Sequence, residues 1–240
     1  MRTAIITIFA LLAAASVQAK TLVVYYSYTN NVERIVNALR TKIDADILEI
    51  EPAQKGLDYA VDNYAIGSAQ IAAIRNNPDE AASYPAIDPV DVNLSDYDCI
   101  IVGAPLWWSN MAAPLQTFLF QYGKEMEGKK IGLIVSSASS GISGVEADAK
   151  RLIPGGDFLS PSLWIRSSQT SNAGSMIDAW LKDINYDSLT AGISHVSTDT
   201  DERYTVYTLS GVKLLSDVSS TAGLSTGIYI INGKKTIISK

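Results

Sequence analysis

The chain has 240 residues, in which 19 Lys and Arg stand against 25 Asp and Glu, so its formal net charge is −6. An acidic chain is not expected to bind nucleic acid or an anionic membrane through charge alone. The one cysteine, Cys99, excludes an internal disulfide and a metal site built from several cysteines. Because Cys99 lies in the apolar run of DYDCIIVGAP, we expect it to pack in the core.

Residues 1–19 have the pattern of a secretory signal peptide. Arg2 precedes the apolar stretch Ala4–Val17, and Val17-Gln18-Ala19 has the small residues of a cleavage site. The apolar stretch is shorter than the roughly 20 residues that span a bilayer. We therefore expect cleavage after Ala19, a periplasmic, extracellular or cell-surface protein, and no membrane span after cleavage. The alternative is an uncleaved membrane anchor.

The first expected strand, 21–26, leads through a polar loop into an expected helix, 32–42. The apolar residues of the helix have the spacing of one helix face: Val32, Ile35, Val36 and Leu39. Hydroxyl and amide side chains fill the loop where the N–H groups of a helix N-terminus favour an anion: Ser27, Tyr28, Thr29, Asn30 and Asn31. The alternative is that these residues only cap the helix.

The later elements alternate in type along the chain. Further strands are expected at 46–50, 98–103, 131–136 and about 159–165, and further helices at 58–75, 113–123, 144–152 and 173–185. This alternation predicts an α/β fold with a five-stranded parallel sheet and helices on both faces. Ligands of such sheets bind beyond the carboxyl ends of the strands, so we expect the site in the loops after the first, third and fourth strands.

The loops after the third and fourth strands are suited to a flat ligand. Gly103 and Pro105 are expected to end the third strand, and Trp107 and Trp108 then stand in a loop. Two adjacent Trp residues form either a packed lid or a surface that stacks on a flat ring. The fourth strand is followed by SSASSGISG, residues 136–144, whose small residues let backbone amides approach a ligand.

The chain changes character after residue 187. Residues 188–199 are small and polar, as in a linker, and include the one histidine, His195, which we interpret as a loop residue. Residues 200–240 are rich in β-forming residues, and Asn232-Gly233 between two such runs predicts a hairpin. We therefore expect a small C-terminal β module.

Three of these loops together resemble the FMN-binding loops of the flavodoxin family. They are Ser27-x-Thr29-x-Asn31, GAPLWWSNMAAPLQTFL and SSASSGISG, and the second resembles the Pro-x-Trp-Trp pattern of the branch with a long excursion before the third strand. The resemblance covers about residues 20–187 and implies the flavodoxin-like fold, non-covalent FMN and electron transfer. The chain departs from the family at Val32, often a hydroxyl residue there, and in the lower glycine content of the third loop.

The resemblance assigns a role to each loop. It implies that the phosphate of FMN is held by Ser27, Thr29, Asn30 and Asn31, with the backbones of Tyr28 and Val32 close by. The isoalloxazine ring would be bordered by Pro105, Leu106, Trp107, Trp108, Ser109 and Asn110. The ribityl chain and the polar edge of the ring would face Ser137, Ser139, Ser140 and Gly141. No catalytic residue and no metal ligand is implied.

Three functions remain open. The first is an exported one-electron carrier whose partner is a redox protein or a small redox molecule, and the acidic charge suits a low-potential flavin. The second is an FMN-dependent NAD(P)H:quinone reductase, although the loops offer no clear clamp for a nicotinamide phosphate. The third is a degenerate, non-redox binding module.

The C-terminal module resembles, more weakly, modules of exported Bacteroidetes proteins, some of them sorting signals. The alternative is that it is a simple edge hairpin over the main domain.

Overall fold

The computed structural model describes residues 19–190, 204–209, 211–218, 223–232 and 234–238. These residues belong to two compact units, one that spans Ala19–Ala191 and one within Gly192–Lys240. The expected signal peptide up to residue 18, most of the expected linker with His195, and Gly233 lie outside the described residues. None of the helices in the described ranges is both long and apolar enough to cross a bilayer.

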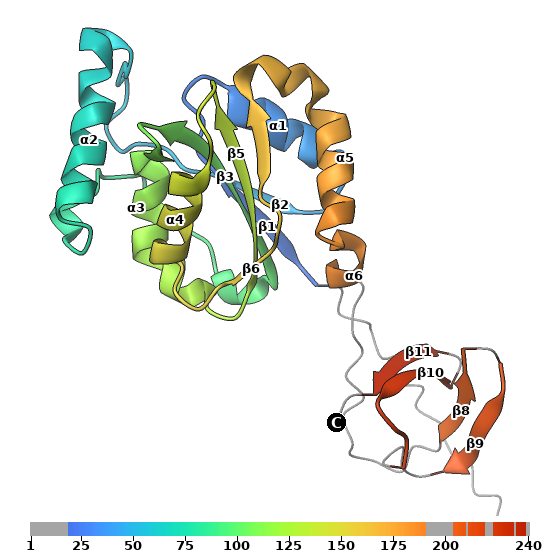
Figure 1. Ribbon diagram of the computed structural model, residues 1–240. Coiled ribbons are helices and arrows are strands. Elements are labelled where there is room, and N and C mark those ends of the chain that lie inside the picture. Colours follow the sequence, from blue (N-terminus) through green and yellow to red (C-terminus); the bar gives the residue numbers. More distant parts are fainter. Residues whose placement is uncertain (1–18, 191–203, 210, 219–222, 233, 239–240) are drawn as a thin grey trace, which may run out of the picture. The chain divides into compact units, whose positions relative to one another are not determined.

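The larger unit is built on a parallel sheet (Figure 1). Its strands are β1 (Thr21–Tyr25), β2 (Asp46–Glu49), β3 (Cys99–Trp107), β5 (Lys130–Ser137) and β7 (Leu163–Arg166). They pair in parallel in the order β2-β1-β3-β5-β7. The short strand β6 (Asp157–Phe158) also pairs with β5, and β4 (Asn110–Met111) runs antiparallel to the end of β3. The predicted five-stranded parallel sheet is confirmed.

Helices cover both faces of this sheet. They are α1 (Asn31–Leu39), α2 (Ala65–Asn76), α3 (Ala113–Tyr122), α4 (Ser143–Leu152), α5 (Ala173–Asp183) and α6 (Tyr186–Thr190). Figure 1 shows α3 and α4 on one face and α1 and α5 on the other. Short 3₁₀ turns lie at Val61–Tyr64, Ala81–Ser83, Leu94–Asp96, Gly123–Met126 and Ser167–Asn172.

The period of two along each strand divides the core into two layers. In β1, Leu22 and Val24 pack into the layer under α3 and α4, whereas Val23 and Tyr25 pack into the layer under α1 and α5. Every residue of β1 is buried, which is why the strand appears in the sequence as an unbroken apolar run. Cys99 is 2% exposed and packs in the second layer, as predicted.

Several predicted boundaries were wrong. The helix expected at 58–75 begins only at Ala65, because Asp62, Asn63 and Tyr64 have positive φ angles that no α-helix accommodates. The strand expected at 159–165 is reduced to β7 (Leu163–Arg166), after Pro161, which has no N–H to donate to a strand ladder. Residues 188–190, expected in the linker, belong to α6.

The second unit is a small antiparallel sheet. Its strands are β8 (Tyr204–Thr208), β9 (Lys213–Val218), β10 (Gly227–Ile231) and β11 (Lys234–Ile238), in the order β11-β10-β8-β9. The side chains of Tyr204, Val206, Leu224 and Ile231 form its core. The predicted hairpin joins β10 to β11, with Ile231 paired to Lys234 and Asn232 at a φ of 49°. The predicted β module is confirmed.

Candidate functional site

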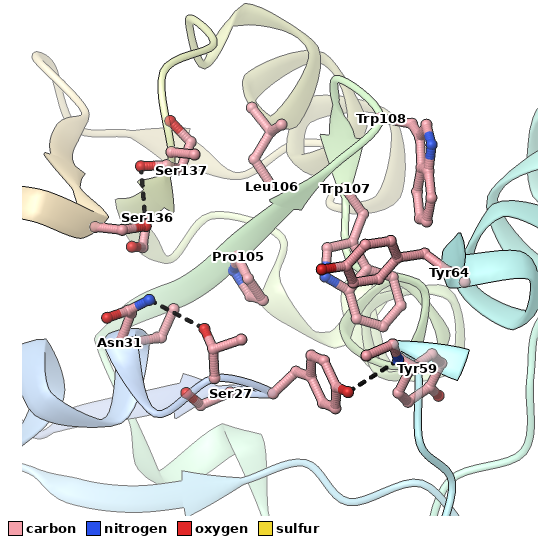
Figure 2. A pocket seen from close by; sticks show the side chains of 17 residues that line it. Ser27, Asn31, Tyr59, Tyr64, Pro105, Leu106, Trp107, Trp108, Ser136 and Ser137 are labelled. Carbon is pink, nitrogen blue, oxygen red and sulfur yellow. Dashed lines mark hydrogen bonds between the residues drawn. The ribbon is translucent and has the colours of Figure 1, made fainter. Parts of the chain in front are cut away.

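A pocket of about 650 Å³ opens where β1, β3 and β5 end (Figure 2). Its volume lies within the roughly 300–1,000 Å³ of small-molecule sites. The residues that line it are Ser27, Tyr28, Thr29, Asn31, Val32, Tyr59, Ala60, Tyr64, Gly67, Pro105, Leu106, Trp107, Trp108, Ser136, Ser137, Ala138 and Ser167. The loops after the first, third and fourth strands of the sheet therefore meet here, as the sequence predicts.

The first wall is the N-terminus of α1. The hydroxyl of Ser27 accepts a hydrogen bond of 3.2 Å from the backbone N–H of Glu33, so Ser27 does cap this helix. The side-chain amide of Asn31 donates to the hydroxyl of Thr29 over 3.0 Å, within the pocket lining. The opening N–H groups of a helix have no partner inside the helix, so this wall offers donors to an anion.

Val32 lines the pocket, but its side chain packs in the core. It is 1% exposed, and a Cβ atom built at Gly103 of β3 would lie 3.2 Å from its Cγ1. Gly103 thus allows the first turn of α1 to approach β3 closely. A hydroxyl in place of the Val32 side chain would therefore lie in this core.

The second wall is a tight hairpin, which corrects the expectation that β3 ends at Pro105. The strand continues to Trp107, where Trp107 pairs with Asn110 of β4. Trp108 and Ser109 form the two-residue turn with φ angles of 46° and 66°, as in a type I′ turn. Trp107 is thus a strand residue rather than a loop residue, while the Trp108 side chain is 44% exposed at the pocket.

The third wall comes from the segment before α2, which the sequence did not assign to the site. The rings of Tyr59 and Trp107 lie 4.8 Å apart between centroids. The Tyr28 hydroxyl donates to Asp58 over 2.8 Å and accepts from the N–H of Ala60 over 3.0 Å, which attaches this segment to the first loop. Tyr64 lines the pocket together with the two Trp residues (Figure 2).

Gly67 completes this wall because it leaves space for the Trp pair. Burial raises the pKa of the Tyr59 hydroxyl, so this ring stays neutral at ordinary pH. The lining residues, all within the described part of the chain, include no carboxylate and no basic side chain. The pocket therefore combines an aromatic wall with neutral donors.

The fourth wall is the end of β5. The hydroxyl of Ser136 is buried and has no hydrogen-bond partner, and this residue lines the pocket. The hydroxyl of Ser137 is occupied, because it donates to the carbonyl of Ser140 over 2.8 Å and accepts from the indole N–H of Trp164 over 2.8 Å. Ser167 donates to the carbonyl of Ser137 over 3.3 Å.

Some expected site residues lie outside the pocket lining: Asn30, Ser109, Asn110, Ser139, Ser140 and Gly141. Asn30 has a φ of 61° and forms the turn into α1. The side chain of Asn110 donates to Asp148 of α4 instead. Among the residues that the sequence missed, Ser136 was the nearest to detection, since it opens the SSASSGISG loop. Tyr59 and Tyr64 lie in the segment that the sequence predicted as the first turns of a helix.

Comparisons with known proteins agree with this arrangement. Residues 20–184 match the model of a family described as flavodoxin. A protein from Bacteroides eggerthii DSM 20697, classed as a flavoprotein, has a similar fold with a TM-score of 0.56 and 24% identity, covering 70% of this chain and 98% of that one. A second flavoprotein, from Bacteroides uniformis ATCC 8492, has a TM-score of 0.52 and 24% identity, and the match covers 67% of this chain and 99% of that one. A flavoprotein from Lactobacillus acidophilus NCFM, solved in complex with FMN, has a TM-score of 0.51 and 22% identity, and the match covers 65% of this chain and 99% of that one.

Proposed function

This chain belongs to the flavodoxin family, and on that premise we propose that it binds FMN non-covalently and carries single electrons outside the cytoplasm. The observation that carries the proposal is that one pocket joins a helix N-terminus, an aromatic wall and an unpartnered buried hydroxyl. These three features correspond to the three parts of FMN, which are a terminal phosphate, a flat ring and a polar ring edge. The structure of the Lactobacillus acidophilus flavoprotein with FMN supports the choice of ligand.

The residues present fit this cofactor. The Thr29 hydroxyl, the Asn31 amide and the first turn of α1 supply neutral donors for the phosphate. The Trp107 and Trp108 rings supply apolar surface for the isoalloxazine, with a gain of about 0.5–1.5 kcal/mol for each well-placed aromatic pair beyond the area that it buries. Ser136 also lines the pocket, and its buried hydroxyl has no partner in the protein.

The chain's own residues suit electron transfer more than acid–base chemistry. When bound, FMN supplies the redox chemistry, and the protein supplies position and electrostatics. Burial raises the pKa of the hydroxyls of Tyr26 and Tyr59, so both rings stay neutral near neutral pH. The described lining contains no carboxylate, histidine or lysine that would act as a general acid or base.

The rim of the pocket is apolar and open to solvent. Among the described residues of the larger unit, the exposed large apolar side chains are Val61, Tyr64 and Trp108, and two of these three line the pocket. Such a rim supports contact with a redox partner at the edge of a bound ring. The rim also favours the second candidate, a quinone reductase, because exposed aromatic faces can hold a flat substrate.

Export is part of the proposal. The Arg2 to Ala19 pattern supports a cleaved signal peptide and a periplasmic, extracellular or cell-surface protein. The redox partner would then be a protein or small redox molecule of that compartment. The C-terminal β module is proposed to serve this exported state, either as a sorting element or as a cover for the main domain.

The test is direct titration of the ligand-free protein with FMN, followed by flavin fluorescence. We expect saturable binding with one FMN per chain, and complete release of the flavin when the complex is denatured. Flavin that stays with the denatured chain would contradict non-covalent binding. A protein that carries no flavin after incubation with excess FMN and removal of the unbound flavin would contradict the proposal and favour the non-redox binding module.

A further inference from the structure

A buried polar cluster lies behind the hairpin that carries the two Trp residues. The Oδ2 atom of Asp148, on α4, accepts from the backbone N–H of Met111 over 2.9 Å and from the side-chain amide of Asn110 over 3.0 Å. Both donors belong to β4, directly after the Trp108–Ser109 turn. Asp148 is only 7% exposed, so these bonds are shielded from water.

The other carboxylate oxygen is also engaged. Arg151 donates to Oδ1 of Asp148 over 3.2 Å and to the side-chain carbonyl of Gln116 over 2.8 Å. The amide of Gln116 in turn donates to the backbone carbonyl of Met111 over 2.7 Å. Both backbone polar groups of Met111 are therefore held, and Arg151 joins the two side chains that hold them.

The same helix touches the turn itself. A Cβ atom at Gly144, near the start of α4, would lie only 1.8 Å from the carbonyl oxygen of Ser109. Only glycine allows α4 and the turn to approach this closely. Trp108 and Ser109 also hold positive φ angles that cost free energy for residues with a Cβ, and such a conformation persists only where the surroundings enforce it.

We propose that Asp148 is a positioning residue for the aromatic wall of the pocket, acting through Asn110 and Met111 to hold the strained Trp108–Ser109 turn. It does not line the pocket. The expected effect of Asp148 on flavin affinity rests on the proposed function. Its expected effect on the hairpin does not, since Asp148 contacts the hairpin through protein groups alone.

The test uses two variants in α4. One changes the bonds from Asp148 to β4, and the other changes the approach of Gly144 to Ser109 in the turn. In Asp148→Asn, one oxygen must serve both sides, so either the β4 donors or Arg151 lose their acceptor. In Gly144→Ala, a methyl group displaces the Ser109 carbonyl while α4 gains a better helix former. The control is Ile177→Val, which removes one methylene from the other core layer, where Ile177 is fully buried.

The first measurement is the near-ultraviolet circular dichroism of the ligand-free protein. The Trp107 and Trp108 rings lie 6.4 Å apart at 80°, so their coupled signal reports the geometry of the hairpin. We expect this signal to change in both variants but not in Ile177→Val. The difference should vanish when Asp148→Asn is made in a Trp108→Phe background.

The second measurement compares affinities for FMN and riboflavin in the full-length chain. We expect the affinity of both variants to fall about tenfold for each ligand, because the Trp107–Trp108 wall moves while the wall at the N-terminus of α1 stays in place. An unchanged ligand-free spectrum in Asp148→Asn overturns the positioning role, and so does unchanged FMN affinity in that variant while the wild type binds. Failure of the wild-type protein to bind FMN overturns the proposed function alone.

Discussion

The ring of Trp108 occupies the space that Gly67 leaves open on α2. A Cβ atom at position 67 would lie 3.1 Å from Cζ3 of Trp108 and 3.4 Å from Cε3 of Trp107. A glycine inside a helix is less favourable than alanine by roughly 0.5–1 kcal/mol, so its presence here costs stability. Glycine at position 67 therefore leaves space for the two Trp rings, whereas alanine would stabilise the helix.

Gly67→Ala should therefore raise stability and weaken flavin binding at the same time. Alanine favours the helix, with a gain of up to about 1 kcal/mol, while its methyl group displaces the Trp108 ring. We expect a higher midpoint in thermal unfolding and FMN affinity lowered severalfold. The control is Gly174→Ala in α5, where the nearest side chain, Lys42, is 3.8 Å from the new Cβ. Equal FMN affinity in Gly67→Ala and wild type would remove Trp108 from the binding site.

The double change Thr29→Ala and Asn31→Ala should weaken FMN binding far more than riboflavin binding, because riboflavin lacks the phosphate. Each lost hydrogen bond to a charged group costs about 1.5–3 kcal/mol, so the FMN affinity should fall by roughly two to four orders of magnitude if the effects add. Paired titrations with both ligands measure the difference. Thr41→Ala, which removes a hydroxyl bonded to Ala38 at the other end of α1, is the control. An equal loss for both ligands would place the phosphate elsewhere.

Cys99 should be inert in the native protein. It is 2% exposed, and burial raises the pKa of its thiol to about 11, so almost no thiolate is present near neutral pH. We expect no alkylation by iodoacetamide at pH 8 over hours, and complete alkylation in denaturant. Mass spectrometry of the intact chain gives the result. Rapid native labelling would show that the strand pairing around Cys99 opens easily.

The exported protein should begin at Lys20. The reason is the small-residue pattern Val17-Gln18-Ala19 after an apolar stretch. N-terminal sequencing of the protein recovered from the cell envelope or medium checks this. Recovery of a chain that still starts at Met1 would contradict cleavage.

The sheet was predictable because burial on both faces leaves a plain trace in a sequence. All of β1 and the first six residues of β3 are buried, and both appear as continuous apolar runs. The helix α1 was equally plain, since Val32, Ile35, Val36 and Leu39 are its buried residues. The positions of the three site loops follow from strand direction alone.

The features that could not be predicted from the sequence depend on residues other than glycine that adopt positive φ angles. The turn at Trp108–Ser109 needs two positive φ angles, which Asn-Gly or Gly-Gly usually announces. Asp62, Asn63 and Tyr64 likewise adopt positive φ, and so a helical pattern overran its true start at Ala65. The partners Asp148 and Asn110 are 38 residues apart, and no local pattern connects them.

Anaerobic reduction of the FMN-loaded protein tests most directly the proposal that this chain is a one-electron carrier. One sample is titrated with a low-potential one-electron donor, and parallel samples are mixed with NADH and with NADPH, while the visible flavin spectrum is recorded. If Trp107 and Trp108 stack on the isoalloxazine as proposed, they would cover the face that hydride transfer requires and leave the ring edge, which suffices for an electron. We predict reduction in two resolved one-electron steps by the donor and negligible reduction by either nicotinamide. Rapid bleaching by NADH or NADPH in a single two-electron step would contradict the account and assign the protein to the quinone reductases.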